Sequence, residues 1–146
     1  MTELLDRIVA RTRADVAARR EAPLPARRAP DPRGRFRAAL EGARSRGAPG
    51  LGLIAELKPR SPSHGPLRQA GHIDGVLEVY ARRADAVSVL VDAAFFGGGL
   101  DLLARARARL DAPLLAKGFV LAPRQIDEAH AFGADAVLLI ARLLED

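Results

Sequence analysis

The chain has 146 residues, 49% of them hydrophobic, and a formal net charge of +5 at pH 7, which suits one domain with a buried core. The absence of cysteine excludes disulfides and thiolate metal sites, and no apolar run approaches the about 20 residues of a membrane span. The charge comes from arginines scattered among alanines and acids, and only 4% of the residues are aromatic, so we expect no nucleic-acid partner and no membrane contact.

The N-terminal third predicts helix and linker. Apolar residues within 2–20 recur at helical spacing, and Thr2 is a candidate N-cap. Residues 22–34 are rich in proline and arginine and predict a connector, and 35–46 predict a short helix that ends at Gly47. Because the first residues include arginines and acids and no apolar signal region, we expect no signal peptide and a cytoplasmic protein.

Strand and helix patterns alternate through the rest of the chain. The predicted strands are near-continuous apolar runs at 51–58, 85–91, 113–119 and 134–141. The predicted helices cover 73–83, 100–110 and 123–132, and a long loop and a glycine-rich turn follow the first and second strands at 59–72 and 92–99. This order is typical of a parallel sheet covered by helices.

A short internal repeat supports the same architecture. The residues Ala-Asp-Ala-Val occur at 84–87 and again at 134–137, each time at the start of a predicted strand. Such a spacing fits a two-step repeat of strand–helix units.

The two lysines are the first candidates for chemistry. All of the 23 basic residues except Lys58 and Lys117 are arginines, and lysine can exchange a proton where arginine cannot. Both lysines lie near the carboxyl end of a predicted strand, the edge where active sites form in α/β folds. Glu56 shares a strand face with Lys58, so we expect two ammonium groups and one carboxylate to converge. An ordinary surface ion pair between Glu56 and Lys58 is the alternative.

Several joint motifs resemble the indole-3-glycerol phosphate synthase family. They are IAELKPRSPS at 54–63 followed by His64 and Gly65, SVLVD…FFGG within 88–98, LAKGF at 115–119 and RQIDEAHAFGADAVLLI at 124–140. The first helix also resembles the extra helix that precedes the family's barrel. The resemblance covers essentially the whole chain, with the motifs in the family's order.

The resemblance implies an α/β fold of the TIM (β/α)8-barrel family. Residues 1–48 would form an N-terminal helical extension and linker, and 49–146 a partial (βα)4 half barrel. The family is a carboxy-lyase of tryptophan biosynthesis. It closes and decarboxylates 1-(2-carboxyphenylamino)-1-deoxyribulose 5-phosphate, a small phosphorylated substrate, and it needs neither cofactor nor metal.

The resemblance also implies roles for individual residues. Lys117 would protonate the ketone oxygen of the substrate, Lys58 would bind the substrate carboxylate, and Glu56 would orient Lys58. Three further residues would bind the substrate: Ser61 beside the first loop, and Phe96 with Phe119 as an apolar wall. Taken alone, Phe96 and Phe119 are better explained by core packing, and Ser61 by turn formation beside proline.

The sequence departs from the family pattern at three places. Val91 stands where threonine is usual, Gly118 where aspartate is usual, and Gly98–Gly99 where Gly-Ser is common. Gly118 is expected to loosen the backbone next to Lys117. A complete barrel has eight strands and about 250 residues, so we expect a truncated half barrel whose phosphate-binding loops would lie beyond Asp146.

Half a barrel leaves unpaired strand edges and an uncovered inner face. Self-association or a complementing half-barrel chain would cover them, and a non-catalytic remnant or one subunit of a split barrel is the alternative function. A Schiff-base role for Lys117 and a basic nucleic-acid binder are weaker hypotheses.

Overall fold

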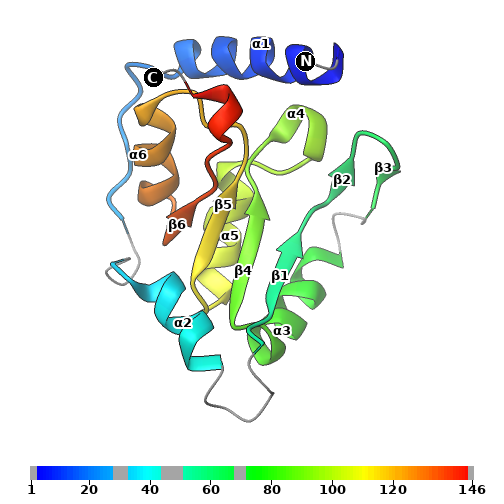
Figure 1. Cartoon of the computed structure of the whole chain (residues 1–146), viewed down its shortest axis with the longest axis vertical. Coiled ribbons are helices and arrows are strands. Elements are labelled where there is room, and N and C mark those ends of the chain that lie inside the picture. Colours follow the sequence, from blue (N-terminus) through cyan, green and yellow to red (C-terminus); the bar gives the residue numbers. More distant parts are fainter. Residues whose placement is uncertain (1–2, 28–32, 44–50, 68–71, 145–146) are drawn as a thin grey trace.

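The computed structural model describes residues 3–27, 33–43, 51–67 and 72–144 (Figure 1). Two N-terminal helices come first, α1 (Glu3–Ala18) and α2 (Arg35–Ala43). Thr2 and Gly47, predicted to begin and end these helices, lie outside the described residues. No helix in the described part of the chain has the length and apolar character needed to cross a membrane.

A four-stranded parallel sheet in the order β1-β4-β5-β6 forms the centre of the molecule. Its strands are β1 (Ile54–Leu57), β4 (Ala86–Leu90), β5 (Leu114–Lys117) and β6 (Ala136–Val137). The connecting helices are α3 (Ile73–Arg83), α5 (Leu100–Arg109) and α6 (Pro123–Ala131). The expected alternation of parallel strands and helices is confirmed, and the described residues form no closed barrel.

Three local predictions differ from the structure. The long loop after β1 contains a small hairpin, β2 (Arg60–Ser61) with β3 (Gly65–Pro66). The glycine-rich turn contains the helix α4 (Ala93–Phe96). The predicted strand 134–141 is wrong beyond Val137, because β5 is the only ladder partner of β6 among the described residues and their pairing ends at Ala116 and Val137. The chain instead turns into the short 3-10 helix η2 (Ala141–Leu143).

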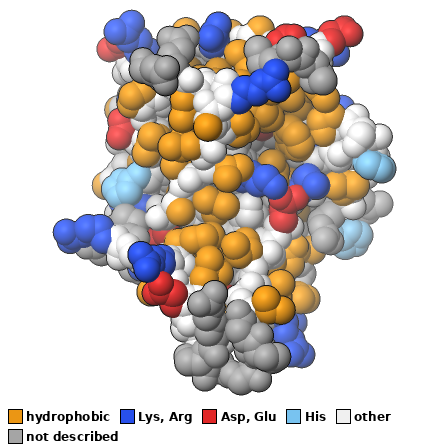
Figure 2. Space-filling view, in the orientation of Figure 1, with side chains coloured by type: hydrophobic (Ala, Val, Ile, Leu, Met, Phe, Trp, Pro, Cys, Tyr) orange, Lys and Arg blue, Asp and Glu red, His pale blue; other side chains and the backbone are white. Residues whose placement is uncertain are grey.

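Only one face of the sheet is covered by helices. The side chains of Leu57, Val87 and Leu114 are fully buried against α3, α5 and α6. On the opposite face, Ile54 is 43% and Leu138 37% exposed. Figure 2 shows hydrophobic side chains gathered over the strands on this uncovered side. The fold therefore presents an open sheet face instead of a filled barrel interior.

The repeated Ala-Asp-Ala-Val motif has the same structure both times. Asp85 accepts a hydrogen bond from the backbone N–H of Leu53 at 2.9 Å and donates its own N–H to the carbonyl of Leu53 at 3.0 Å. Asp135 makes the same two bonds to Leu114, each at 2.8 Å. Asp85 thus holds the start of β1 beside β4, and Asp135 holds the start of β5 beside β6. These bonds set the register of the two strand pairs.

Asp135 also holds the N-terminal segment. Its side chain is 0% exposed and lies 3.1 Å from Arg27, 2.9 Å from Arg35 and 3.2 Å from Arg107. Burial lowers the pKa of the Arg107 guanidinium; nearby Asp135 opposes that shift, and Arg35 adds to it. Three guanidinium groups from separate segments therefore depend on one buried carboxylate.

A second buried carboxylate fastens α1 to α6. Glu128 is 3% exposed and accepts hydrogen bonds from Arg19 at 3.2 Å and Arg124 at 3.3 Å. Arg124 also donates to the carbonyl of Ala22. In Figure 1, α1 consequently lies across the end of the sheet toward which β1 and β4 point.

We predict that Asp135→Asn lowers the free energy of unfolding by about 3 kcal/mol or more, because it leaves buried guanidinium groups without their countercharge. Urea unfolding followed by circular dichroism would measure the change. The matched control is Asp74→Asn, since Asp74 pairs with Arg105 and Arg109 at the surface and such pairs contribute at most about 1 kcal/mol. Equal losses in the two variants would contradict the role given to Asp135.

Candidate active site

A single carboxylate joins the two lysines of the chain. Glu56 Oε1 lies 3.0 Å from Lys58 Nζ, and Glu56 Oε2 accepts a hydrogen bond from Lys117 Nζ. The three side chains lie on the uncovered sheet face and are about a third exposed, at 30%, 35% and 40% for Glu56, Lys58 and Lys117. The structure therefore brings together the three residues that the sequence singled out.

The strand register explains how β1 and β5 reach each other across β4. Glu56 is aligned with Ser88, and Lys117 with Leu90. Both Ser88 and Leu90 are buried, so they fill the floor between the flanking strands. Lys117 lies further along its strand than Glu56, and its long side chain reaches back over this floor to the carboxylate.

Two residues near Glu56 were missed by sequence reasoning. The Tyr80 hydroxyl donates a hydrogen bond to the Glu56 carbonyl at 2.8 Å, which ties β1 to α3 beside the carboxylate. Ser88 is 5% exposed, and its hydroxyl has no hydrogen-bond partner among the described residues. A lone serine in an otherwise apolar strand was a visible signal for Ser88, whereas nothing in the sequence pointed to Tyr80.

The lysines keep Glu56 ionised. Partial burial raises the pKa of its carboxyl, but hydrogen bonds and charge from Lys117 and Lys58 outweigh burial and bring the pKa below its ordinary value. The group therefore carries two positive charges and one negative charge at neutral pH. Such a group can bind an anion and offer an ammonium proton to a developing oxyanion.

The space around position 118, next to Lys117, explains why glycine occupies it. A Cβ atom at position 118 would lie 2.8 Å from Val91 Cγ2, which is closer than carbon atoms normally approach. The backbone N–H of Val91 also donates to the Lys117 carbonyl at 2.9 Å. Val91 thus occupies the space beside Gly118 and holds the backbone of Lys117, so the glycine is packed in place.

The predicted substrate-binding residues fall into two groups. The rings of Phe96 and Phe119 lie 6.1 Å apart at an interplanar angle of 34°, so the two aromatic side chains are neighbours. Ser61 lies on the β2–β3 hairpin, where its hydroxyl is 3.0 Å from that of Ser63. Strand β2 contacts α4, which places the hairpin beside the helix that carries Phe96.

The described ranges contain no group of three or more histidines or acids positioned to hold a metal ion. The three side chains that meet at Glu56 offer an ammonium donor, a second ammonium and a shared carboxylate.

Comparisons with known proteins give a consistent result. The family model for indole-3-glycerol phosphate synthase matches residues 5–146. The indole-3-glycerol phosphate synthase of Verminephrobacter eiseniae is 43% identical over 157 aligned positions, which cover all of this chain and 58% of that protein. The same enzyme of Albidiferax ferrireducens is 44% identical, with all of this chain and 57% of the relative covered. The chain therefore spans less than two thirds of the length of these relatives.

The lowered pKa of Glu56 predicts a pH dependence of stability. A carboxyl whose pKa is lower folded than unfolded stabilises the fold above its unfolded pKa, and this contribution is lost as pH falls through the folded value. The control is Glu41→Gln, which removes an exposed carboxylate on α2 and keeps Glu56. As the pH falls below about 4.3, we expect the free energy of unfolding to fall less steeply in Glu56→Gln than in this control. Urea titrations at several pH values measure the slopes, and parallel slopes would contradict the interpretation.

The packing of Gly118 predicts a coupled pair of substitutions. Gly118→Ala should destabilise the protein by about 1–3 kcal/mol, the usual cost of overpacking. Adding Val91→Ala should make the double variant more stable than the sum of the two single effects predicts. Gly75→Ala is the control, because a Cβ at that position in α3 meets nothing within 4 Å. Thermal or urea unfolding measures all four variants, and strict additivity would rule out the steric explanation.

Proposed function

The chain belongs to the indole-3-glycerol phosphate synthase family, and from this premise we propose that it carries the lysines of a carbon–carbon lyase of tryptophan biosynthesis. The proposed reaction closes the ring of 1-(2-carboxyphenylamino)-1-deoxyribulose 5-phosphate and removes its carboxylate. The observation that supports this proposal most directly is the Glu56 carboxylate held between Lys58 and Lys117.

Lys117 acts as the proton donor in this proposal. The ring carbon that bears the carboxylate bonds to the ketone carbon, and the Lys117 ammonium gives a proton to the ketone oxygen as negative charge develops there. The carboxylate, bound by Lys58, then leaves as CO2, and loss of water completes the indole ring. Lys58 assists the later proton transfer, and no cofactor takes part.

Sharing one carboxylate suits this sequence of events. Glu56 pairs with both ammonium groups, so neither is left uncompensated. A substrate carboxylate can replace Glu56 at Lys58 while Glu56 keeps its bond to Lys117. The surplus positive charge favours an anionic, phosphorylated substrate. Phe96 and Phe119 would form the wall against its aromatic ring, and Ser61 would line the pocket from the hairpin.

A complete site needs more than the described residues provide. In the proposal, residues 1–48 are an extension and linker, and 49–146 are the first half of one barrel domain. The uncovered sheet face, with Ile54 and Leu138 exposed, would be covered by a polypeptide that carries the rest of the barrel or by a second copy of the chain. The alternative function is a non-catalytic half barrel, which the same exposed face would also fit.

We predict that Lys117→Arg lowers turnover at least about 100-fold, because arginine keeps the charge but cannot donate its proton at neutral pH. The chain would be mixed with a polypeptide that carries the unmatched part of the Verminephrobacter eiseniae relative, and product would be followed by indole fluorescence. Arg82→Lys, at an exposed position of α3, is the control. An active Lys117→Arg mixture would refute the acid role. Absence of turnover with the unaltered chain in a formed complex would favour the non-catalytic alternative.

A further inference from the structure

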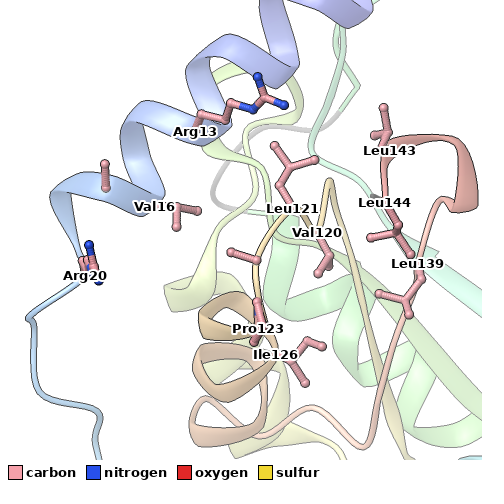
Figure 3. Close-up of a pocket in the computed structure, with 12 residues that line it drawn as sticks. Arg13, Val16, Arg20, Val120, Leu121, Pro123, Ile126, Leu139, Leu143 and Leu144 are labelled. Carbon is pink, nitrogen blue, oxygen red and sulfur yellow. The ribbon is translucent and has the colours of Figure 1, made fainter. Parts of the chain in front are cut away.

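An apolar groove lies where α1, the start of α6 and the segment after β6 meet (Figure 3). Its volume is about 710 Å³, and we call it the α1–α6 groove. Val16 lines it from α1, Ile126 from α6, and Leu139 and Leu143 from the C-terminal segment. The groove is separate from the lysine site, since none of its lining residues belongs to that site.

The groove has exposed apolar side chains that the fold leaves uncovered. Leu139 lies just beyond the end of β6, which stops at Val137. Val137 packs against the buried core, whereas Leu139 is 48% exposed and Ile126 on α6 is 40% exposed. Covering these apolar side chains removes their surface from water, which is favourable, so the groove is a surface suited to docking.

Parallel sheets indicate what kind of element fits there. A strand in such a sheet is followed by a helix that packs back on the sheet beside the preceding helix. Helices α3, α5 and α6 do this after β1, β4 and β5. The α1–α6 groove is the next position in this series, so a helix that follows β6 would bury Leu139 and Ile126 together.

The wall formed by α1 adds a charge requirement. Arg13 and Val16 are spaced so that they share one face of α1, and Arg20 follows just after the helix ends at Ala18. All three line the groove. The Arg20 side chain is 83% exposed, and its distance to Glu21 is 3.8 Å. A helix that follows a strand begins at the carboxyl edge of the sheet, which α1 crosses in Figure 1. Acidic residues in its first turn would face these arginines and also suit its dipole.

We propose that the α1–α6 groove is the docking site for an amphipathic helix with an acidic first turn, carried by the polypeptide that completes the barrel. This inference deepens the proposed function and rests on its completing partner, but not on its chemistry. The relatives are longer than this chain, so they contain sequence that could supply such a helix. A second copy of the chain fits less well, because each copy has a net charge of +5 and would bring arginines against a basic surface.

Binding to the unmatched part of the Verminephrobacter eiseniae relative tests the proposal without any need for turnover. Fluorescence anisotropy of that labelled polypeptide should show saturable binding to the whole chain. We expect Ile126→Glu to weaken binding at least tenfold, because it places a charge in the groove. Leu4→Glu is the matched control, since Leu4 is also helical and also 40% exposed, and it should leave binding unchanged. Circular dichroism would establish that both variants are folded.

The charge requirement gives a second readout. Arg13→Glu combined with Arg20→Glu should weaken binding, and the difference from the unaltered chain should shrink as salt is raised. Absence of binding, or equal weakening by Leu4→Glu and Ile126→Glu, would overturn the docking site. An alternative result in sedimentation is that the chain is a dimer and that Ile126→Glu dissociates it. That result would identify a second copy as the occupant of the groove and would overturn the proposed docking of a partner helix. If the complex forms and depends on the groove but yields no indole product, only the proposed catalysis is rejected and the docking site stands.

Discussion

The buried carboxylate of Asp135 is the interaction on which most of the arrangement depends. It accepts the backbone N–H of Leu114, which fixes β5 beside β6, and it is the countercharge for Arg27, Arg35 and Arg107. Strand register and attachment of the N-terminal segment therefore share one cause. A charge this deeply buried is tolerable only while its partners are present, so the segment before the sheet is part of the folded unit.

The lysine site follows from that register. Parallel pairing places the carboxyl ends of β1 and β5 at one edge of the sheet, and the buried side chains of β4 leave room for Lys117 to reach Glu56. A shift of one residue in β1 or in β5 would move a member of the group to the helix-covered face. The contact between Val91 and Gly118 keeps the backbone at the end of β5 in the position that this geometry needs.

The same architecture leaves two surfaces uncovered, and they differ in character. The inner sheet face is apolar around a charged group, which suits a cavity that binds a substrate. The α1–α6 groove is apolar with a basic rim, which suits a helix. Both are explained if the described residues form the first part of a barrel: the inner face would become its interior, and the groove would receive the next helix of its outer layer.

The sequence by itself determined the order of strands and helices, the repeat at Asp85 and Asp135, and the pairing of Glu56 with Lys58, because each of these is written in local periodicity. It also pointed to Lys117 through its place at a strand end. Only the tertiary structure decided that one carboxylate serves both lysines, that Tyr80 ties it down, and that β6 stops at Val137. These features depend on contacts between residues distant in the chain, for which local patterns carry no signal.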